Sequence, residues 1–98
     1  MTDARFLEGA CFRRQTAGGD ILDAIGGWEV WTCDGPEFRH DYDQTVTLYV
    51  HRGAAVVDFK GGGRADLRPG DTMTIRKGAS AVWAISAPIR NSYVYCDA

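Results

Sequence analysis

Two side chains that can exchange protons or hydrogen bonds, His40 and Tyr42, stand two residues apart near the middle of the chain. Residues two apart on a β-strand project from the same face, so a strand over 37–42 presents both together. Imidazole titrates near neutral pH, and a tyrosine hydroxyl donates or accepts a hydrogen bond. The pair therefore indicates a ligand-binding site or an acid–base site, against the simpler interpretation of two packed side chains.

Three other features could carry chemistry. Arg76 follows an apolar segment, and a guanidinium at the rim of a site can clamp a carboxylate. Cys11, Cys33 and Cys96 are an odd set without close spacing, which indicates packing residues rather than a disulfide framework or a zinc site. No helix and no Lys-Ser/Thr pair follows the glycines at 61–63, so we interpret them as a hairpin loop and not as a phosphate-binding loop.

The elements that must position these residues are strands. From Trp28 onward, alternating polar and apolar residues separated by turn residues predict about eight strands, at 28–33, 37–42, 45–52, 54–59, 64–67, 72–75, 81–86 and 89–95. In the segment 45–52, Val46, Leu48 and Val50 face one way, whereas Thr47, Tyr49 and His51 face the other. His51 is therefore assigned to an outer or interface surface, and Arg52-Gly53 is predicted to reverse the chain.

The first 27 residues are predicted to be irregular. Apolar pieces at 6–7 and 11–12 could lie along a sheet edge, and residues 20–25 could form one helical turn. We therefore expect one domain over 1–98, with an N-terminal segment over 1–27 and a barrel over 28–96. The fold class is all-β, a small barrel or jelly roll of about eight or more antiparallel strands with little helix.

Composition excludes several functions. The 98 residues carry a formal charge of −2, and the eleven basic residues are scattered, which argues against nucleic-acid or membrane-surface partners. The polar start lacks the apolar core of a signal peptide, and no apolar run is long enough to span a bilayer. We expect a soluble, cytoplasmic protein. Nine of the eleven cations are Arg, which is typical of a GC-rich bacterial gene.

Several short motifs follow one another in a definite order from Trp28 to Tyr93. They are Gly27-Trp28-Glu29, Phe38-Arg39, Tyr42-Asp43, Gly53, Arg68-Pro69-Gly70-Asp71, Lys77-Gly78, Trp83 and Pro88-Ile89-Arg90. Their order and spacing resemble the cupin superfamily. They are most similar to the small single-domain cupins related to ureidoglycine aminohydrolase and to the cupin of ethanolamine utilisation. The resemblance covers about two thirds of the chain and implies an RmlC-like jelly-roll barrel.

The resemblance also implies where a metal would bind. In the family, two His residues, a carboxylate and a third His form a cage for Mn, Fe, Ni or Zn. The matching positions here are His40, Tyr42, Val46 and Ala81, so one good ligand remains and no carboxylate offsets a dication's charge. We therefore expect no metal and no other cofactor. Arg76 replaces a common Pro of the family, Arg52 a common Glu, and Asn91 a common Lys.

Two functional hypotheses remain. The first is a metal-free small cupin that binds a small polar or anionic molecule in the barrel, or that serves as a non-catalytic dimeric module. The alternative is an enzyme of the ureidoglycine aminohydrolase or ethanolamine-utilisation type with an atypical active site. The enzyme alternative also includes a metal-free isomerase that uses His40 as base and Tyr42 as acid.

The expected pocket is lined by His40, Tyr42, Trp83 and Tyr93 above a floor of Val46, Leu48 and Val50. Arg76 at its edge would favour a small organic acid. A homodimer is also expected, because Thr47, Tyr49 and His51, together with Trp28 or Trp31, form more aromatic outer surface than a small monomer exposes.

Overall fold

The computed structural model describes residues 4–61 and 63–96, and within them the chain forms eight strands, one short α-helix and one 3₁₀ turn. Their bounds are β1 Leu7–Glu8, β2 Phe12–Thr16, α1 Gly19–Ala24, η1 Ile25–Gly27, β3 Glu29–Cys33, β4 Glu37–Asp41, β5 Val46–Phe59, β6 Gly63–Leu67, β7 Asp71–Ile75 and β8 Ser80–Tyr95. Residue 62 of the predicted hairpin loop and residues 1–3 of the polar start lie outside the described residues. The all-β prediction is confirmed.

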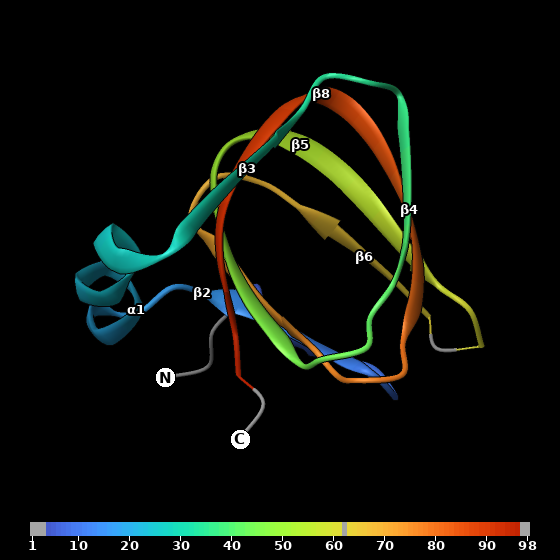
Figure 1. Ribbon diagram of the computed structural model, residues 1–98, viewed down its shortest axis with the longest axis horizontal. Coiled ribbons are helices and arrows are strands. Elements are labelled where there is room, and N and C mark those ends of the chain that lie inside the picture. Colours follow the sequence, from blue (N-terminus) through green and yellow to red (C-terminus); the bar gives the residue numbers. More distant parts are fainter. Residues whose placement is uncertain (1–3, 62, 97–98) are drawn as a thin grey trace.

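The strands are antiparallel and run in the order β1-β2-β7-β5-β8-β3, while β4 pairs with β8 and β6 pairs with β5. The long strands β5 and β8 pair with each other over most of their length. The first part of β5 also pairs with β7 and its last part with β6, whereas β8 pairs first with β4 and then with β3. In Figure 1 the strands wrap around a common interior, and α1 projects outside this wall.

β5 and β8 each bend without breaking, which corrects two sequence predictions. The expected reversal at Arg52-Gly53 is wrong, because the register between the two strands shifts around these residues while pairing continues. Gly53 has φ of +92°, and a Cβ there would lie 2.2 Å from the Pro88 carbonyl oxygen. Only glycine permits this close approach, so a bulge bends the strand where we expected a turn. The predicted strands at 45–52 and 54–59 are therefore one element, as are those at 81–86 and 89–95.

One side of the interior, between β2, β6, β7 and the end of β5, is closely filled. Phe12 and Phe59 stack with ring centroids 4.6 Å apart and an interplanar angle of 8°. Leu67, Met73 and Ile75 are at most 1% exposed around them. These side chains bury the apolar faces of four strands together, which is the main stabilising term of a small barrel. We call the set Phe12, Val57, Phe59, Ala65, Leu67, Met73 and Ile75 the closed side.

The N-terminal segment is more regular than predicted, since β2 pairs with β7 over five residues. Polar contacts tie it to the barrel. Arg14, which is buried, donates to the Asp66 carboxylate at 2.7 Å and to the Asp66 backbone oxygen at 2.8 Å. Arg5 donates to the carboxylate of Asp71. No helix in the described part of the chain is both long and apolar enough to cross a membrane.

Candidate functional site

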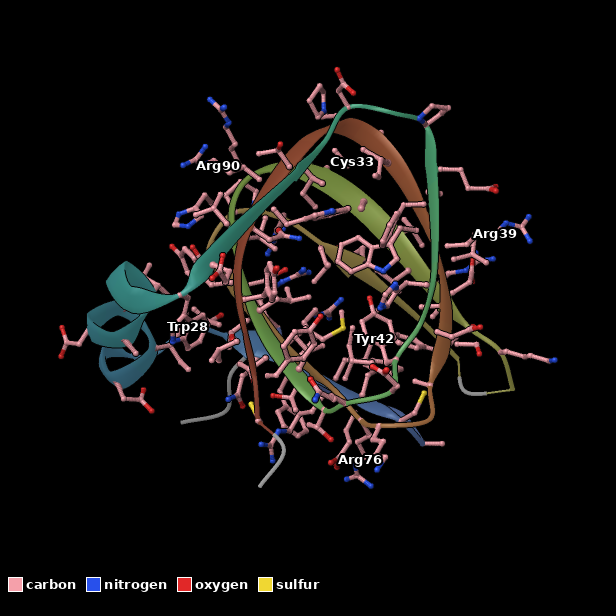
Figure 2. All side chains as sticks on the ribbon, in the orientation of Figure 1. Trp28, Cys33, Arg39, Tyr42, Arg76 and Arg90 are labelled. Carbon is pink, nitrogen blue, oxygen red and sulfur yellow. The ribbon has the colours of Figure 1, made fainter. Side chains whose placement is uncertain are left out.

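β4 and the residue after it place the exposed His40 and the buried Tyr42 opposite the first half of β8. His40 is the cross-strand partner of Ala81, and Phe38 is the partner of Trp83. The backbone of Tyr42 is held at both ends, because its N–H donates to the Ala79 carbonyl and its own carbonyl accepts from Gly78. Figure 2 shows the Tyr42 side chain inside the barrel.

Trp83 and Tyr42 form the buried polar contact of this site. The indole Nε1–H of Trp83 donates to the Tyr42 hydroxyl oxygen over 3.2 Å, and both side chains are at most 8% exposed. Burial raises the pKa of Tyr42 to about 12; the Trp83 hydrogen bond lowers it and nearby Tyr95 raises it further. Tyr42 is therefore a neutral phenol at physiological pH, with its own proton available for a hydrogen bond.

A cavity of about 160 Å³ lies against this pair. β3 and β4 supply one part of its wall, the first part of β5 supplies a second, and β8 supplies the rest. Its lining consists of Trp31, Phe38, His40, Tyr42, Val46, Leu48, Trp83, Asn91, Tyr93 and Tyr95. The structure therefore brings together four predicted site residues, His40, Tyr42, Trp83 and Tyr93, on a floor of Val46 and Leu48. Val50, predicted in that floor, is fully buried elsewhere in the core.

Aromatic rings dominate the lining. Trp31 meets Phe38 at 4.8 Å and Trp83 at 5.6 Å between centroids, with interplanar angles of 50° and 69°. His40 stands edge-to-face with Tyr42 at 4.6 Å. Tyr93 and Tyr95 form a second such pair at 5.7 Å. Phe38 and His40 are stacked, with centroids 5.8 Å apart and an interplanar angle of 13°, so both preferred kinds of ring contact occur around the cavity.

Asn91 is the one lining residue with an unmet hydrogen-bonding need. The residue is 2% exposed, and its Oδ1 is the buried side-chain polar atom without a partner among the described residues. A buried acceptor left unpaired costs about 1–3 kcal/mol. Asn91 also borders the cavity, so a rotation of its amide about χ2 would bring Oδ1 within reach of a donor placed in that space.

Arg76 is not part of this site, which corrects its predicted place at the pocket edge. It follows Ile75, whose side chain is fully buried, so strand alternation turns Arg76 to the outside. Its side chain is 64% exposed and lies 3.9 Å from the Glu8 carboxylate. It borders a separate surface depression with Cys11, Lys60 and Lys77. Figure 2 shows it pointing away from the barrel.

Outer-face residues lie largely as predicted. His51 is exposed and its Nε2 lies 2.6 Å from the Ser92 hydroxyl, while its ring meets Tyr49 at 5.0 Å. Trp31 lines the cavity, so it adds nothing to the outer surface. Val30, 48% exposed, stands there in its place. The homodimer stays a prediction, resting on Thr47, Tyr49 and His51 together with Trp28.

The residues at the family's metal positions do not fit a metal. His40 and Ala81 stand opposite each other, so the fourth ligand position holds a methyl group. Val46 is a buried apolar residue, and the Tyr42 hydroxyl is a neutral phenol engaged by Trp83. Within residues 4–61 and 63–96, no three His, Cys, Asp or Glu side chains gather into a possible metal cluster. One imidazole alone is a weak site for a divalent ion.

Four residues that line the cavity were not predicted from the sequence: Trp31, Phe38, Asn91 and Tyr95. The signal for three of them was present as a period of two. Phe38 precedes His40 by two residues, and Asn91 and Tyr95 flank Tyr93 in the same way. Asn91 stands where the family commonly has Lys, and that difference alone does not place it in a site.

The bent β5 and β8 strands and the eight-stranded antiparallel sheet that wraps around a common interior define a small cupin. The chain belongs to the family of EutQ-like cupin domains, whose model matches residues 23–93. No curated protein matches it.

Solved structures show the same fold. A DUF861 family protein from Thermotoga maritima is 24% identical, with a TM-score of 0.81 over 87% of this chain and 99% of that one. A putative ethanolamine utilization protein Q from Salmonella typhimurium is 20% identical, with a TM-score of 0.60 over 87% of this chain and 68% of that one. An RmlC-like cupin from Shewanella frigidimarina is 17% identical, with a TM-score of 0.55 over 95% and 83%.

Proposed function

We propose that this cupin binds a small molecule in the barrel cavity and does so without metal-assisted turnover. The observation that carries the proposal is Asn91, a residue that borders the cavity and whose buried Oδ1 has no partner among the described residues. A barrel that served only as packing would gain stability from an apolar residue at this position. A ligand with an N–H or O–H group explains the retained amide, because its donor completes the hydrogen bond.

The lining limits the chemistry of that ligand. None of the described lining residues is Lys, Arg, Asp or Glu. The expected preference for an organic acid depended on Arg76, which points away from the cavity. No cationic side chain in the lining therefore compensates the negative charge of a carboxylate. The volume is close to that of an engineered cavity of about 150 Å³ that admits benzene. The proposal is therefore a small, non-anionic molecule with at least one hydrogen-bond donor.

Tyr42 favours binding over the metal-free isomerase considered above. A general acid works best when its pKa is near the operating pH, and burial has moved the pKa of Tyr42 to about 12. The hydroxyl oxygen is already occupied by the Trp83 indole. This arrangement suits a fixed hydrogen-bonding wall better than a group that gives up its proton in each cycle.

An NMR titration tests the proposal, with the three indole N–H signals as reporters. Trp31 and Trp83 line the cavity, whereas Trp28 lies beside the α1 region (Figure 2) and serves as an internal control. A panel of small neutral amides and alcohols should shift the Trp31 and Trp83 signals saturably and leave Trp28 in place. The proposal is wrong if no compound moves the first two signals, or if all three move together.

A further inference from the structure

We infer that the cavity is an aromatic cage for a small alkylammonium ion, whose N–H group donates to Asn91 Oδ1 while the ring faces surround its charge. The inference rests on the proposed function and names the class of ligand for the same site. It draws on the ring geometry, the absence of opposing charge in the described lining, and the orientation of the Trp83 donor.

Seven of the ten lining side chains are aromatic or imidazole rings, and they come from β3, β4, the residue after β4, and both halves of β8. Rings thus approach the cavity from several directions. The face of each phenyl, phenol and indole ring carries partial negative charge, which attracts a cation within about 6 Å of the centroid. A neutral apolar ligand would need only aliphatic walls such as Val46 and Leu48.

The polar atoms at the cavity favour positive charge as well. Trp83 gives its indole proton to the Tyr42 oxygen, so its one strong donor is not free to hold an anion. Asn91 Oδ1 offers an acceptor without competition. A bond from a charged N–H to such an oxygen is about twice as strong as one between neutral groups.

Charges outside the cavity do not oppose this assignment. On β4, Arg39 alternates with the inward-facing residues, is exposed, and donates to Glu37 at 2.9 Å. Figure 2 shows the Arg39 and Arg90 side chains outside the barrel. Arg76 also lies outside, beside Glu8. A cation in the cavity therefore meets no guanidinium in the lining, and trimethylammonium is about the size of the benzene that a cavity of about this volume admits.

The test uses four probes of similar shape: trimethylammonium, tetramethylammonium, tert-butanol and pivalate. They present, in that order, a cation with a donor, a cation without one, a neutral donor and an anion. Each is titrated by NMR at matched ionic strength, followed by the Trp31 and Trp83 indole signals. We expect trimethylammonium to bind about tenfold more tightly than tert-butanol, tetramethylammonium to fall between them, and pivalate to leave the signals unchanged.

Two variants separate the parts of the inference. Asn91→Leu should reduce trimethylammonium binding to the level of tetramethylammonium, because only the N–H bond is lost. Tyr49→Phe is the control, because Tyr49 lies on the outer face beside His51, and it should leave the affinity for every probe unchanged. Folding of each variant is checked by its dispersed NMR spectrum.

The outcomes distinguish the inference from the proposed function. If tert-butanol binds as tightly as trimethylammonium, the cation assignment is wrong and the binding proposal stands. If pivalate binds most tightly, the cavity selects anions and the proposed exclusion of anions falls as well. If none of the four moves the Trp31 and Trp83 signals, the cage does not exist, and the amide and alcohol panel decides the proposed function separately.

Discussion

The two sides of the barrel interior use aromatic residues in opposite ways. On the closed side, Phe12 and Phe59 lie parallel and fill the space between β2, β5, β6 and β7. On the open side, by which we mean the ten residues that line the cavity, most ring pairs, such as Trp31 and Trp83, meet edge to face, and a hollow remains beside them. The buried cation beside the closed side, Arg14, is paired, whereas Asn91 on the open side is not. Under the proposed function, stability and binding are placed in different parts of one small core, as expected when a site contains groups that a purely structural core would replace.

The bends of β5 and β8 join the two sides. Residues before Gly53 on β5 contribute Val46 and Leu48 to the open side, and residues after it contribute Val57 and Phe59 to the closed side. One tight crossing of Gly53 over Pro88 therefore sets the geometry of both. A substitution at Gly53 should therefore disturb both sides of the interior.

Gly53→Ala should have the largest effect. The added Cβ would meet the Pro88 carbonyl oxygen at 2.2 Å in a backbone conformation that alanine rarely adopts. We expect a loss of more than about 4 kcal/mol in the free energy of unfolding, measured by urea denaturation. Gly35→Ala is the control, since its Cβ would find only the Cys33 sulfur at 3.9 Å. A Gly53→Ala protein as stable as the control would contradict this role of the crossing.

Truncating one ring on each side should give unequal losses. Phe59→Ala removes a buried, stacked ring and should cost about 3–5 kcal/mol in unfolding free energy. Phe38→Ala removes a partly buried ring that already borders a cavity, so the same measurement should show about half that loss or less. Equal losses would mean that the two sides are packed alike.

Tyr42→Phe should cost about 1–3 kcal/mol, because it leaves the buried Trp83 N–H without its acceptor. Thermal or urea unfolding measures the loss, and the indole signal of Trp83 should move with it. Tyr95→Phe, at a residue that is 50% exposed, should change stability little. If the Tyr42→Phe protein matched Tyr95→Phe in stability, the Trp83–Tyr42 bond would have no part in holding the open side.

The sequence predicted the all-β barrel, and it placed His40 and Tyr42 on one face, because alternation and motif spacing can be seen in single strands. It did not predict that β5 and β8 are continuous, since a glycine at a bulge and a glycine at a turn look alike without the partner strand. Arg76 was misplaced because the family spacing indicates a rim position but not which side of the rim. The role of Asn91 depends on neighbours from β3 and β5, which one strand's pattern cannot show.

Asn91→Leu tests the central claim most directly, through stability and binding measured on the same protein. Leucine has a similar size and removes the unpartnered Oδ1, so the free energy of unfolding should stay the same or rise, while trimethylammonium binding followed by the Trp31 and Trp83 signals should weaken. A variant that binds less and is no less stable identifies Asn91 as a residue kept for a ligand. A variant that loses about 2 kcal/mol or more of stability with unchanged binding would contradict the account, because Asn91 would then be structural and the cavity only a gap in the packing.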